Sequence, residues 1–315
     1  MSRDGVVLAL SGGVGGAKLA LGLYRILPPD TLTVIANTGD DFEHLGLAIS
    51  PDLDTLLYTL SGQDNPELGW GRRDETWNFM AALDRLGGAT WFRLGDGDLA
   101  THVERTRRLA AGERLSSIVD DFRRRCGIAA RLLPMSDDKV RTRLDTDGGW
   151  LDFQDYFVRL RCEPAVRRIE FAGAADARAH PGLLQALADP GLRAVVICPS
   201  NPFISIDPII ALPGLRAALA ACRAPVVAVS PIIGGQAVKG PTAKMMRELG
   251  LPVDAAAVAR RYRQFLDLYI ADKADRDAVA GLDLPVVLAR TLMTTLGDRE
   301  RLAQIVLDGA ARVRK

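Results

Sequence analysis

Short, unbroken apolar runs alternate with helix-like segments along most of this chain. An apolar run without alternation is typical of a strand buried on both faces, as in a parallel sheet. The expected strands are residues 5–10, 32–37, 89–95, 130–135, 193–200, 224–231 and 284–290. Helix patterns separate them, at residues 17–27, 75–86, 99–110 and 241–250. This order predicts an α/β fold of the Rossmann-like, doubly wound type with a mainly parallel sheet.

Two regions depart from that pattern. Asp147-Gly148-Gly149 stands between segments in which apolar and polar residues alternate, which favours an antiparallel hairpin. We therefore expect a β insertion or sheet edge at about residues 139–173. From about residue 241 the chain is expected to be a smaller, mainly helical part. With 315 residues there is room for one large domain or two smaller ones, and we predict a single α/β domain over residues 1–315.

Composition excludes several classes of partner. Apolar residues make up 48% and charged residues 25%, as in ordinary globular proteins, and the formal net charge of +1 gives no bulk attraction to nucleic acid or anionic membranes. The arginine-rich segments 104–109 and 120–127 are therefore expected to be solvated helix faces. Four scattered cysteines without a C-x-x-C pair argue against zinc or disulfides and suit a reducing cytoplasm, which is the expected location. Arginines and prolines interrupt the apolar segment 212–233, so we expect no segment that spans a membrane.

Residues 11–18, with the sequence SGGVGGAK, place four glycines within five positions after the first apolar run. A strand that breaks into glycines and continues as a helix presents backbone N–H groups to an anion. Neither standard fingerprint fits: the dinucleotide motif needs glycine where Lys18 stands, and a Walker A loop needs Gly-Lys-Ser/Thr, whereas Ala17 follows Gly16. A tight turn that only allows close packing is the structural alternative. Four glycines and a lysine exceed what such a turn requires, so we favour an anion site.

Carboxylates follow several of the expected strands. Asp40-Asp41, Asp96 with Asp98, and Asp137-Asp138 each come directly after an apolar run. Ligands of parallel sheets bind beyond the carboxyl ends of the strands, and a Mg²⁺ ion on a diphosphate takes carboxylate ligands. Each of these aspartates taken singly is better explained as a helix cap or loop residue.

Pro51 is expected to start a helix, with Asp52 and Asp54 in its first turn. Carboxylates are favoured there by the helix dipole, and a metal could also be presented there. We expect Asp54 to be exposed, so that an asparagine in its place changes the melting temperature little. The three histidines lack metal-ligand spacing and no G-x-S-x-G motif is present, which argues against zinc and serine hydrolases.

An ordered set of segments resembles the 2-phospho-L-lactate transferase family of coenzyme F-420 biosynthesis. The segments are SGGVGGAK, NTGDD, SPDLDTLLY, RLGDGDLATH, LPMSDD, FQDYFV, PSNPFISIDPII, VAVSPIIGGQAVKGP and FLDLYIADKAD, with ARTLMTT near the end. The resemblance implies that a guanosine-diphosphate-activated three-carbon acid is joined to the ribityl hydroxyl of 7,8-didemethyl-8-hydroxy-5-deazariboflavin, releasing GMP, with Mg²⁺. It leaves open whether the acid is of the phospholactate, phosphoenolpyruvate or phosphoglycerate type.

The resemblance also implies roles for particular residues. Asp54, the second aspartate of P-D-L-D-T, and Arg93, where the family often has lysine, are implied as catalytic and deazaflavin-binding. Asn37 and Asp96 are implied as further deazaflavin contacts, and Mg²⁺ would be held by Asp54 with Asp40 or Asp41. The implied nucleotide site consists of Ser11, Gly12, Gly13, Gly15, Gly16, Lys18, Ser200, Asn201 and Pro202. A guanidinium at position 93 keeps the charge of lysine but changes the geometry.

The expected reaction is an in-line phosphoryl transfer, in which the acceptor hydroxyl attacks phosphorus and GMP leaves without a covalent enzyme intermediate. The enzyme is expected to be a homodimer acting on small molecules. The main alternative is a nucleotide-sugar-binding regulator with a related glycine loop. A dinucleotide-dependent oxidoreductase is weaker, because the fingerprint fails at Lys18.

Overall fold

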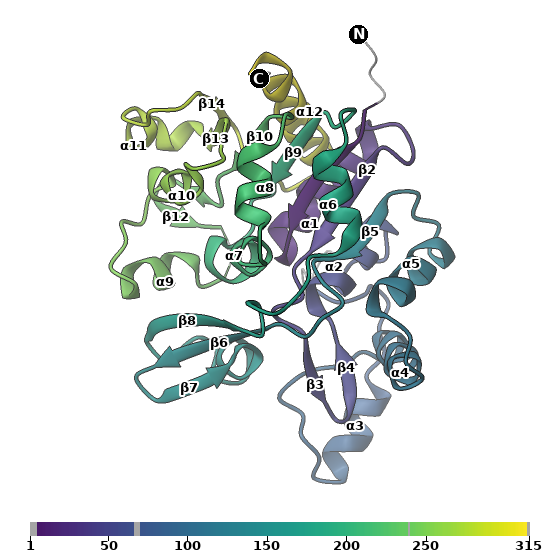
Figure 1. The fold of residues 1–315 in the computed structure, drawn as a ribbon. Helices are drawn as coiled ribbons and strands as arrows, with labels where there is room; N and C mark the ends of the chain where they lie inside the picture. The colour runs from purple at the N-terminus through teal and green to yellow at the C-terminus, as the bar shows by residue number, and fades with distance from the viewer. Residues whose placement is uncertain (1–4, 66–69, 239, 314–315) are drawn as a thin grey trace.

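A seven-stranded parallel sheet forms the centre of the computed structural model, which describes residues 5–65, 70–238 and 240–313 (Figure 1). The strand order is β14-β13-β10-β9-β1-β2-β5, and all neighbours pair in parallel. The strands are β1 Val7–Ser11, β2 Leu32–Ala36, β5 Arg131–Pro134, β9 Ala194–Ile197, β10 Val226–Val229, β13 Leu268–Asp272 and β14 Val286–Ala289. The predicted doubly wound, mainly parallel α/β fold is confirmed.

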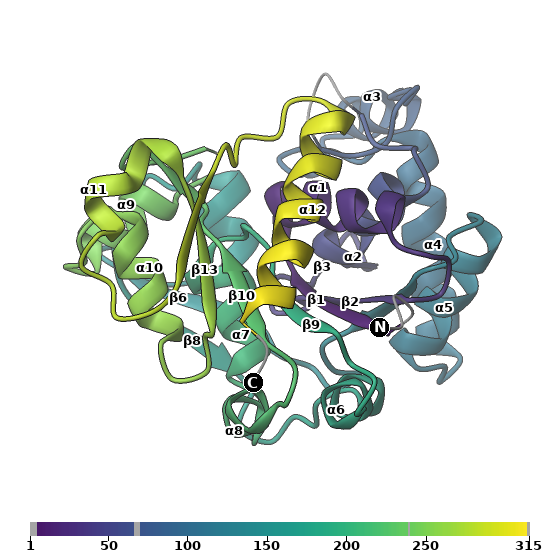
Figure 2. The same ribbon diagram turned by 90° about the horizontal axis from the view of Figure 1, so that it is seen from above.

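Successive residues of each strand contribute to two different apolar cores, one on each face of the sheet. In β1, Leu8 and Leu10 belong to one core, whereas Val7 and Ala9 belong to the other. Figure 2 shows one helix group on each face. The first core is covered by α6 Pro181–Ala188, α7 Asp207–Ile210, α8 Leu215–Ala221 and α10 Ala255–Tyr262. The second is covered by α1 Gly13–Ile26, α2 Pro51–Leu60, α5 Leu115–Arg125 and α12 Leu296–Arg312. Burial on both faces is the reason that the strand sequences are apolar without alternation.

One predicted strand is wrong. Residues 89–95 form no strand and instead connect α3 Asn78–Arg85 to α4 Asp96–Ala110. Phe92 packs edge-to-face on Phe42 with their ring centroids 4.8 Å apart, and Leu94 is buried in a small separate cluster. The apolar residues of this run therefore cover a satellite core outside the sheet. Conversely, β13 was not predicted, because its short apolar sequence is flanked by Asp267 and Asp272.

Smaller sheets lie beyond the edge where the parallel strands end, which we call the carboxyl edge (Figure 1). A three-stranded antiparallel sheet lies within residues 139–173, and its hairpin pairs Thr146 with Gly149 across the predicted turn. Its strands are β6 Arg141–Thr146, β7 Gly149–Asp152 and β8 Val166–Ala172. Two further hairpins are β3 Phe42–His44 with β4 Leu47–Ile49, and β11 Ile232–Ile233 with β12 Gln236–Ala237.

The part from residue 241 onward carries strands β13 and β14 of the main sheet as well as helices. Its helical elements are α9 Thr242–Glu248, α10, η3 Lys273–Asp275, α11 Arg276–Val279 and α12. Two π-helical turns, η1 Asp155–Arg159 and η2 Pro202–Ile206, lie earlier in the chain. Among the described residues, no single helix has the length and apolar character to cross a membrane. The pair Pro202–Ile210 and Leu215–Ala221, bent by 85°, meets those requirements only jointly.

Candidate active site

The glycine turn connects the end of β1 to α1, and close packing or backbone conformation favours glycine at three of its positions. A Cβ on Gly15 would lie 2.6 Å from the carbonyl oxygen of Pro199, and one on Gly16 would lie 2.4 Å from the hydroxyl of Ser200. Gly13 has φ +64°, in the left-handed region that favours glycine. The close packing expected of a tight turn is therefore present in the structure. This packing places the glycine turn against the segment that follows β9.

Side chains of the protein already accept hydrogen bonds from this turn. The Gly12 N–H donates to Ser200 Oγ at 3.1 Å, and the Ser200 hydroxyl donates back to the Gly12 carbonyl at 2.7 Å. The Gly13 N–H donates to the carboxylate of Asp52 at 2.7 Å. Asp52, which comes from the first turn of α2, thus lies at the N-terminus of α1, where an anion is favoured.

Asn37 holds Asp52 from the end of β2. Its Nδ2 donates to Asp52 Oδ2 at 2.9 Å and to the Ile204 carbonyl at 3.1 Å, while its Oδ1 accepts the Gly39 N–H at 2.8 Å. The side chain is fully buried. The structure therefore places Asn37 as a link between β2, α2 and η2, behind the surface of the site.

The other residues of the expected nucleotide site lie on two segments. Asn201 Oδ1 accepts the Phe203 N–H at 2.9 Å and so caps η2, whose first residue is Pro202. Lys18, in the second turn of α1, donates to the Met293 carbonyl at 3.0 Å in the loop before α12. The Ser200–Pro202 segment thus lies beside the glycine turn, whereas the Lys18 ammonium is directed toward the C-terminal loop.

Asp40, Asp41 and Asp52 form a group that we call the acidic cluster. All three side chains are buried, and Ser50 donates to Asp41 Oδ2 at 2.8 Å. Within the described part of the chain, Asp40 Oδ1 and Asp41 Oδ1 are buried without a hydrogen-bond partner. Burial raises the pKa of Asp41 to about 7 and that of Asp52 to about 6. The pKa of Asp40 is raised well above its usual range by burial and then by the nearby charge of Asp52.

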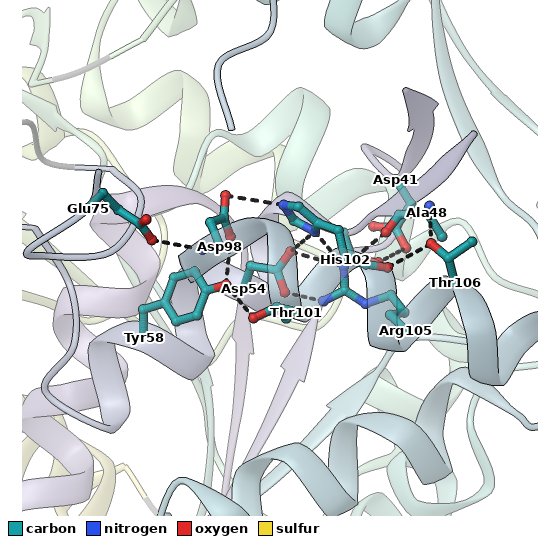
Figure 3. A network of polar contacts seen from close by, with 11 residues as sticks. Asp41, Ala48, Asp54, Tyr58, Glu75, Asp98, Thr101, His102, Arg105 and Thr106 are labelled. Atoms are coloured by element: carbon teal, nitrogen blue, oxygen red, sulfur yellow. Dashed lines mark hydrogen bonds and ion pairs between the residues drawn. The ribbon is translucent and has the colours of Figure 1, made fainter. Parts of the chain in front are cut away.

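Asp54 has different surroundings, although it lies two residues after Asp52 on α2. It is only 4% exposed, and both of its carboxylate oxygens accept hydrogen bonds from Arg105 of α4, with Arg105 Nη1 3.1 Å from Oδ2 (Figure 3). Arg105 is 1% exposed and also donates to the Ala48 carbonyl at 3.2 Å. The prediction of an exposed Asp54 is wrong, because the first turn of α2 faces α4 rather than solvent.

His102 and Asp98 extend this contact along α4. His102 Nδ1 lies 3.3 Å from Arg105 Nη1 and 3.7 Å from Asp54 Oδ2, and its Nε2 lies 3.1 Å from Asp98 Oδ2. The Tyr58 hydroxyl donates to Asp98 Oδ1 at 2.6 Å. We call Asp54, Tyr58, Asp98, His102 and Arg105 the buried network (Figure 3). One ligand atom each from Asp54, Asp98 and His102 lie within 4.8 Å of one another, so these three could hold a metal ion.

Sequence reasoning missed Arg105 as a site residue. Arg105 belongs to the arginine-rich segment 104–109, which was expected to be a solvated helix face. That prediction is wrong for Arg105, which is buried. Arg107 of the same segment is exposed and pairs with Glu104. The available signal is the spacing of Asp98, His102 and Arg105, at positions i, i+4 and i+7 of one helix face.

Asp96 is the first residue of α4, and Arg93 lies in the segment that precedes this helix. Asp96 accepts hydrogen bonds from the Thr76 hydroxyl at 2.5 Å and the Phe79 N–H at 3.0 Å, so it caps the start of α3. These contacts, led by that of Thr76, lower the pKa of Asp96 to about 2. Arg93 is exposed, and its guanidinium lies 4.1 Å from the centroid of the Trp77 ring.

Asp137 and Asp138 have the structural roles that were favoured for them. Asp137 accepts the Ser116 N–H and hydroxyl, each at 2.8 Å, near the start of α5. Asp138 accepts the Arg178 N–H at 2.8 Å. Neither takes part in the acidic cluster or the buried network.

Comparison with known proteins identifies the family. The family model of 2-phospho-L-lactate transferase CofD matches residues 7–286. The chain is 42% identical over 306 residues to a phosphoenolpyruvate transferase of Kitasatospora aureofaciens, covering 95% of both chains. It is 40% identical over 304 residues to a 2-phospho-L-lactate transferase of Methanosarcina mazei, covering 96% of this chain and 99% of the relative.

A solved structure supports the fold independently. A member of the UPF0052 family from Bacillus halodurans superimposes with a TM-score of 0.65 at 14% identity, covering 98% of this chain and all of that one. At that identity the likeness concerns the fold alone. The family model and the relatives confirm the resemblance noted in the sequence, and the chain belongs to the 2-phospho-L-lactate transferase CofD family.

Proposed function

We propose that this chain transfers a guanosine-diphosphate-activated three-carbon acid, as its phosphate ester, to the ribityl hydroxyl of 7,8-didemethyl-8-hydroxy-5-deazariboflavin in coenzyme F-420 biosynthesis. The observation that carries the proposal is the family match over residues 7–286. The relatives named for phosphoenolpyruvate and for 2-phospho-L-lactate transfer are about equally similar, at 42% and 40% identity. We therefore propose a three-carbon acid as the class of substrate, and an experiment must decide which acid of this class is transferred.

The acidic cluster is the place that we propose for Mg²⁺. Buried carboxylate oxygens of Asp40 and Asp41 that lack a hydrogen-bond partner are hard donors, which fit this ion. Burial raises the pKa of both groups, and for Asp41 it outweighs the opposing charges of Arg141 and Arg105, so a bound cation would favour the ionised forms. When bound there, Mg²⁺ would offset charge on the diphosphate. Asp54 is the less suitable ligand of those expected, because Arg105 already engages both of its oxygens.

Asp54 is our proposed catalytic residue. A carboxylate offers about four lone-pair sites, so Asp54 can accept from the ribityl hydroxyl while it keeps its hydrogen bonds to Arg105. It would orient that hydroxyl toward phosphorus and take its proton as the bond to phosphorus forms. The exposed guanidinium of Arg93 would bind the carboxylate of the acid or the phosphoryl group with two parallel hydrogen bonds. The glycine turn and residues 200–202 would form the nucleotide side.

A direct test is to offer the three guanylylated acids separately to the purified protein with deazaflavin and Mg²⁺. We expect GMP release and one product whose mass identifies the acid. An Asp54→Asn variant should lose the activity, and Asp137→Asn, at an aspartate outside the site, should keep it. Absence of turnover with every donor, together with thermal protection by uridine diphosphate sugars, would favour the nucleotide-sugar-binding regulator instead.

Two further features stay predictions. We propose a homodimer, which sedimentation of the purified protein tests. We also propose a cytoplasmic location, which fractionation of the producing cells tests. Neither feature is needed for the assignment of the residues above.

A further inference from the structure

One face of α4 is turned toward the catalytic carboxylate. Asp98, His102 and Arg105 succeed one another along this face, and Arg105 reaches Asp54 on α2 (Figure 3). His102 is 2% exposed and Arg105 is 1% exposed, and His102 contacts Arg105 and Asp98 of the same network. Arg105 is hydrogen-bonded directly to Asp54, so Asp54 is the proposed substrate contact through which both residues can act.

The contacts of His102 determine which ring nitrogen carries the proton. A guanidinium only donates hydrogen bonds, so the 3.3 Å contact from Arg105 Nη1 requires His102 Nδ1 to be the acceptor. The ring proton is then assigned to Nε2, which lies 3.1 Å from Asp98 Oδ2, an ion-pair contact without the geometry of a hydrogen bond. The ring thus has Arg105 at one nitrogen and the Asp98 carboxylate at the other.

Asp98 is itself fixed by two other elements. The Tyr58 hydroxyl of α2 donates to its Oδ1 at 2.6 Å. Glu75 accepts the N–H groups of Gly97 and Asp98 at 2.7 and 2.8 Å, and so holds the first turn of α4 in place. The chain of contacts from Glu75 to Asp54 therefore has no link that depends on a flexible, exposed side chain.

The same three ligand atoms could instead hold a metal, but the surrounding charge argues against it. Arg105 contacts both Asp54 and His102, so its positive charge lies next to two of the three ligands. The pairing already neutralises Asp54, whereas Asp40 Oδ1 and Asp41 Oδ1 have no hydrogen-bond partner among the residues that the structure describes. A second cation here would have to displace the guanidinium.

We propose that His102 and Arg105 are positioning residues of the transfer reaction. Arg105 fixes the direction of both Asp54 oxygens, and His102, oriented by Asp98, fixes Arg105. This inference rests on the proposed function, because it gives Asp54 a catalytic task to be positioned for. It assigns roles to two buried residues of α4.

Steady-state kinetics of four variants tests this positioning. His102→Leu should lower kcat by about 10- to 100-fold with an unchanged KM for the guanylylated acid, because the carboxylate is misdirected and the nucleotide side is untouched. His102→Asn, whose carbonyl oxygen can accept from Arg105, should recover part of that loss. In the double variant with Asp54→Asn, His102→Leu should cost no more than about twofold further. Arg107→Ala, on the exposed face of the same helix, is the matched control and should behave as wild type.

Three outcomes would overturn the inference. Losses that multiply in the double variant would show that His102 acts independently of Asp54, while the transferase activity itself would stand. Wild-type protein that turns over no donor would remove the proposed function, and this inference with it. Stoichiometric Zn²⁺ or Mn²⁺ binding that His102→Leu abolishes and Asp41→Asn preserves would show a metal site instead. Thermal melts identify any variant that fails to fold, and Asp98→Asn then serves as the milder perturbation of the same ring.

Discussion

Two groups of carboxylates lie side by side at the carboxyl edge of the sheet, and they are neutralised in opposite ways. In the buried network, Asp54 has the guanidinium of Arg105 as its counter-charge. In the acidic cluster, one oxygen each of Asp40 and Asp41 has no hydrogen-bond partner within residues 5–65, 70–238 and 240–313, and burial raises the pKa of both groups. The difference is that Asp54 has a cation of this chain hydrogen-bonded to both of its oxygens, whereas the acidic cluster is the place that we propose for a cation from solution.

Asp54→Asn is expected to have the largest effect. It should lower turnover by about 10²- to 10⁴-fold, because the amide cannot take the proton of the attacking hydroxyl. Binding of guanosine diphosphate should persist, since the glycine turn does not contact Asp54. Initial rates across a Mg²⁺ titration measure the first effect, and calorimetry measures the second. Near-normal rates at ordinary Mg²⁺ concentrations would show that Asp54 only holds Arg105.

Arg105→Met should have the next largest effect, on stability. Removing one partner of a buried ion pair leaves Asp54 as an uncompensated buried charge, which costs about 3–5 kcal/mol in the free energy of unfolding. Asp54→Asn in the same chain should restore part of that loss. Urea denaturation measures both, with Arg107→Met as the surface control. A loss below about 1 kcal/mol would mean that the pair is no stronger than an exposed one.

Asp41→Asn should stabilise the protein, whereas Arg105→Met should destabilise it. At about pH 8 without Mg²⁺ we expect the free energy of unfolding to rise by about 1–2 kcal/mol, because a carboxylate whose ionised form is disfavoured by burial is replaced while the contact with Ser50 can be kept. The thermal stabilisation by Mg²⁺ should be weakened in this variant. If Asp41→Asn destabilises the protein as Arg105→Met does, the two groups of carboxylates do not differ in the way described.

The smallest expected effect is on the pH dependence of stability. Folded-state pKa values of about 7 for Asp41 and about 6 for Asp52 exceed the unfolded value of about 3.9. The folded chain then binds more protons between about pH 4 and 7, so these groups make the free energy of unfolding fall as the pH rises. With Mg²⁺ present, the free energy of unfolding should decrease less steeply as the pH rises.

Other titratable groups also contribute to the pH dependence of stability, so the measurement needs a control. Burial lowers the pKa values of His44 and His180, which act in the opposite direction within the same pH range. Asp96, with its pKa of about 2, contributes stability that is lost only as the pH falls from about 4 toward 2. The contribution of Asp41 is therefore the difference between wild type and Asp41→Asn in the slope of the free energy of unfolding against pH. An identical slope in the two proteins would contradict the assignment.

The sequence predicts the sheet well because burial on both faces leaves a one-dimensional signal, the unbroken apolar run. The same signal fails for residues 89–95, since a run that covers a satellite core has the same composition as a strand. For the site, the aspartates and the glycine turn are visible in the sequence. The partner of Asp54 is not, because Arg105 lies 51 residues away, in an arginine-rich segment that also contains the exposed Arg107. Only the fold distinguishes a buried guanidinium from a solvated one.

The contact between α1 and α12 has a consequence for the order of folding. A Cβ on Gly22 of α1 would lie 2.2 Å from the Arg299 carbonyl oxygen, and Lys18 bonds to Met293, 275 residues further along the chain. Contacts of such sequence separation form late, because a long loop must close before they add stability. During synthesis on the ribosome, the helix after the glycine turn therefore remains without its full apolar cover until α12 has emerged. The glycine turn and α1, although they are made first, are completed last.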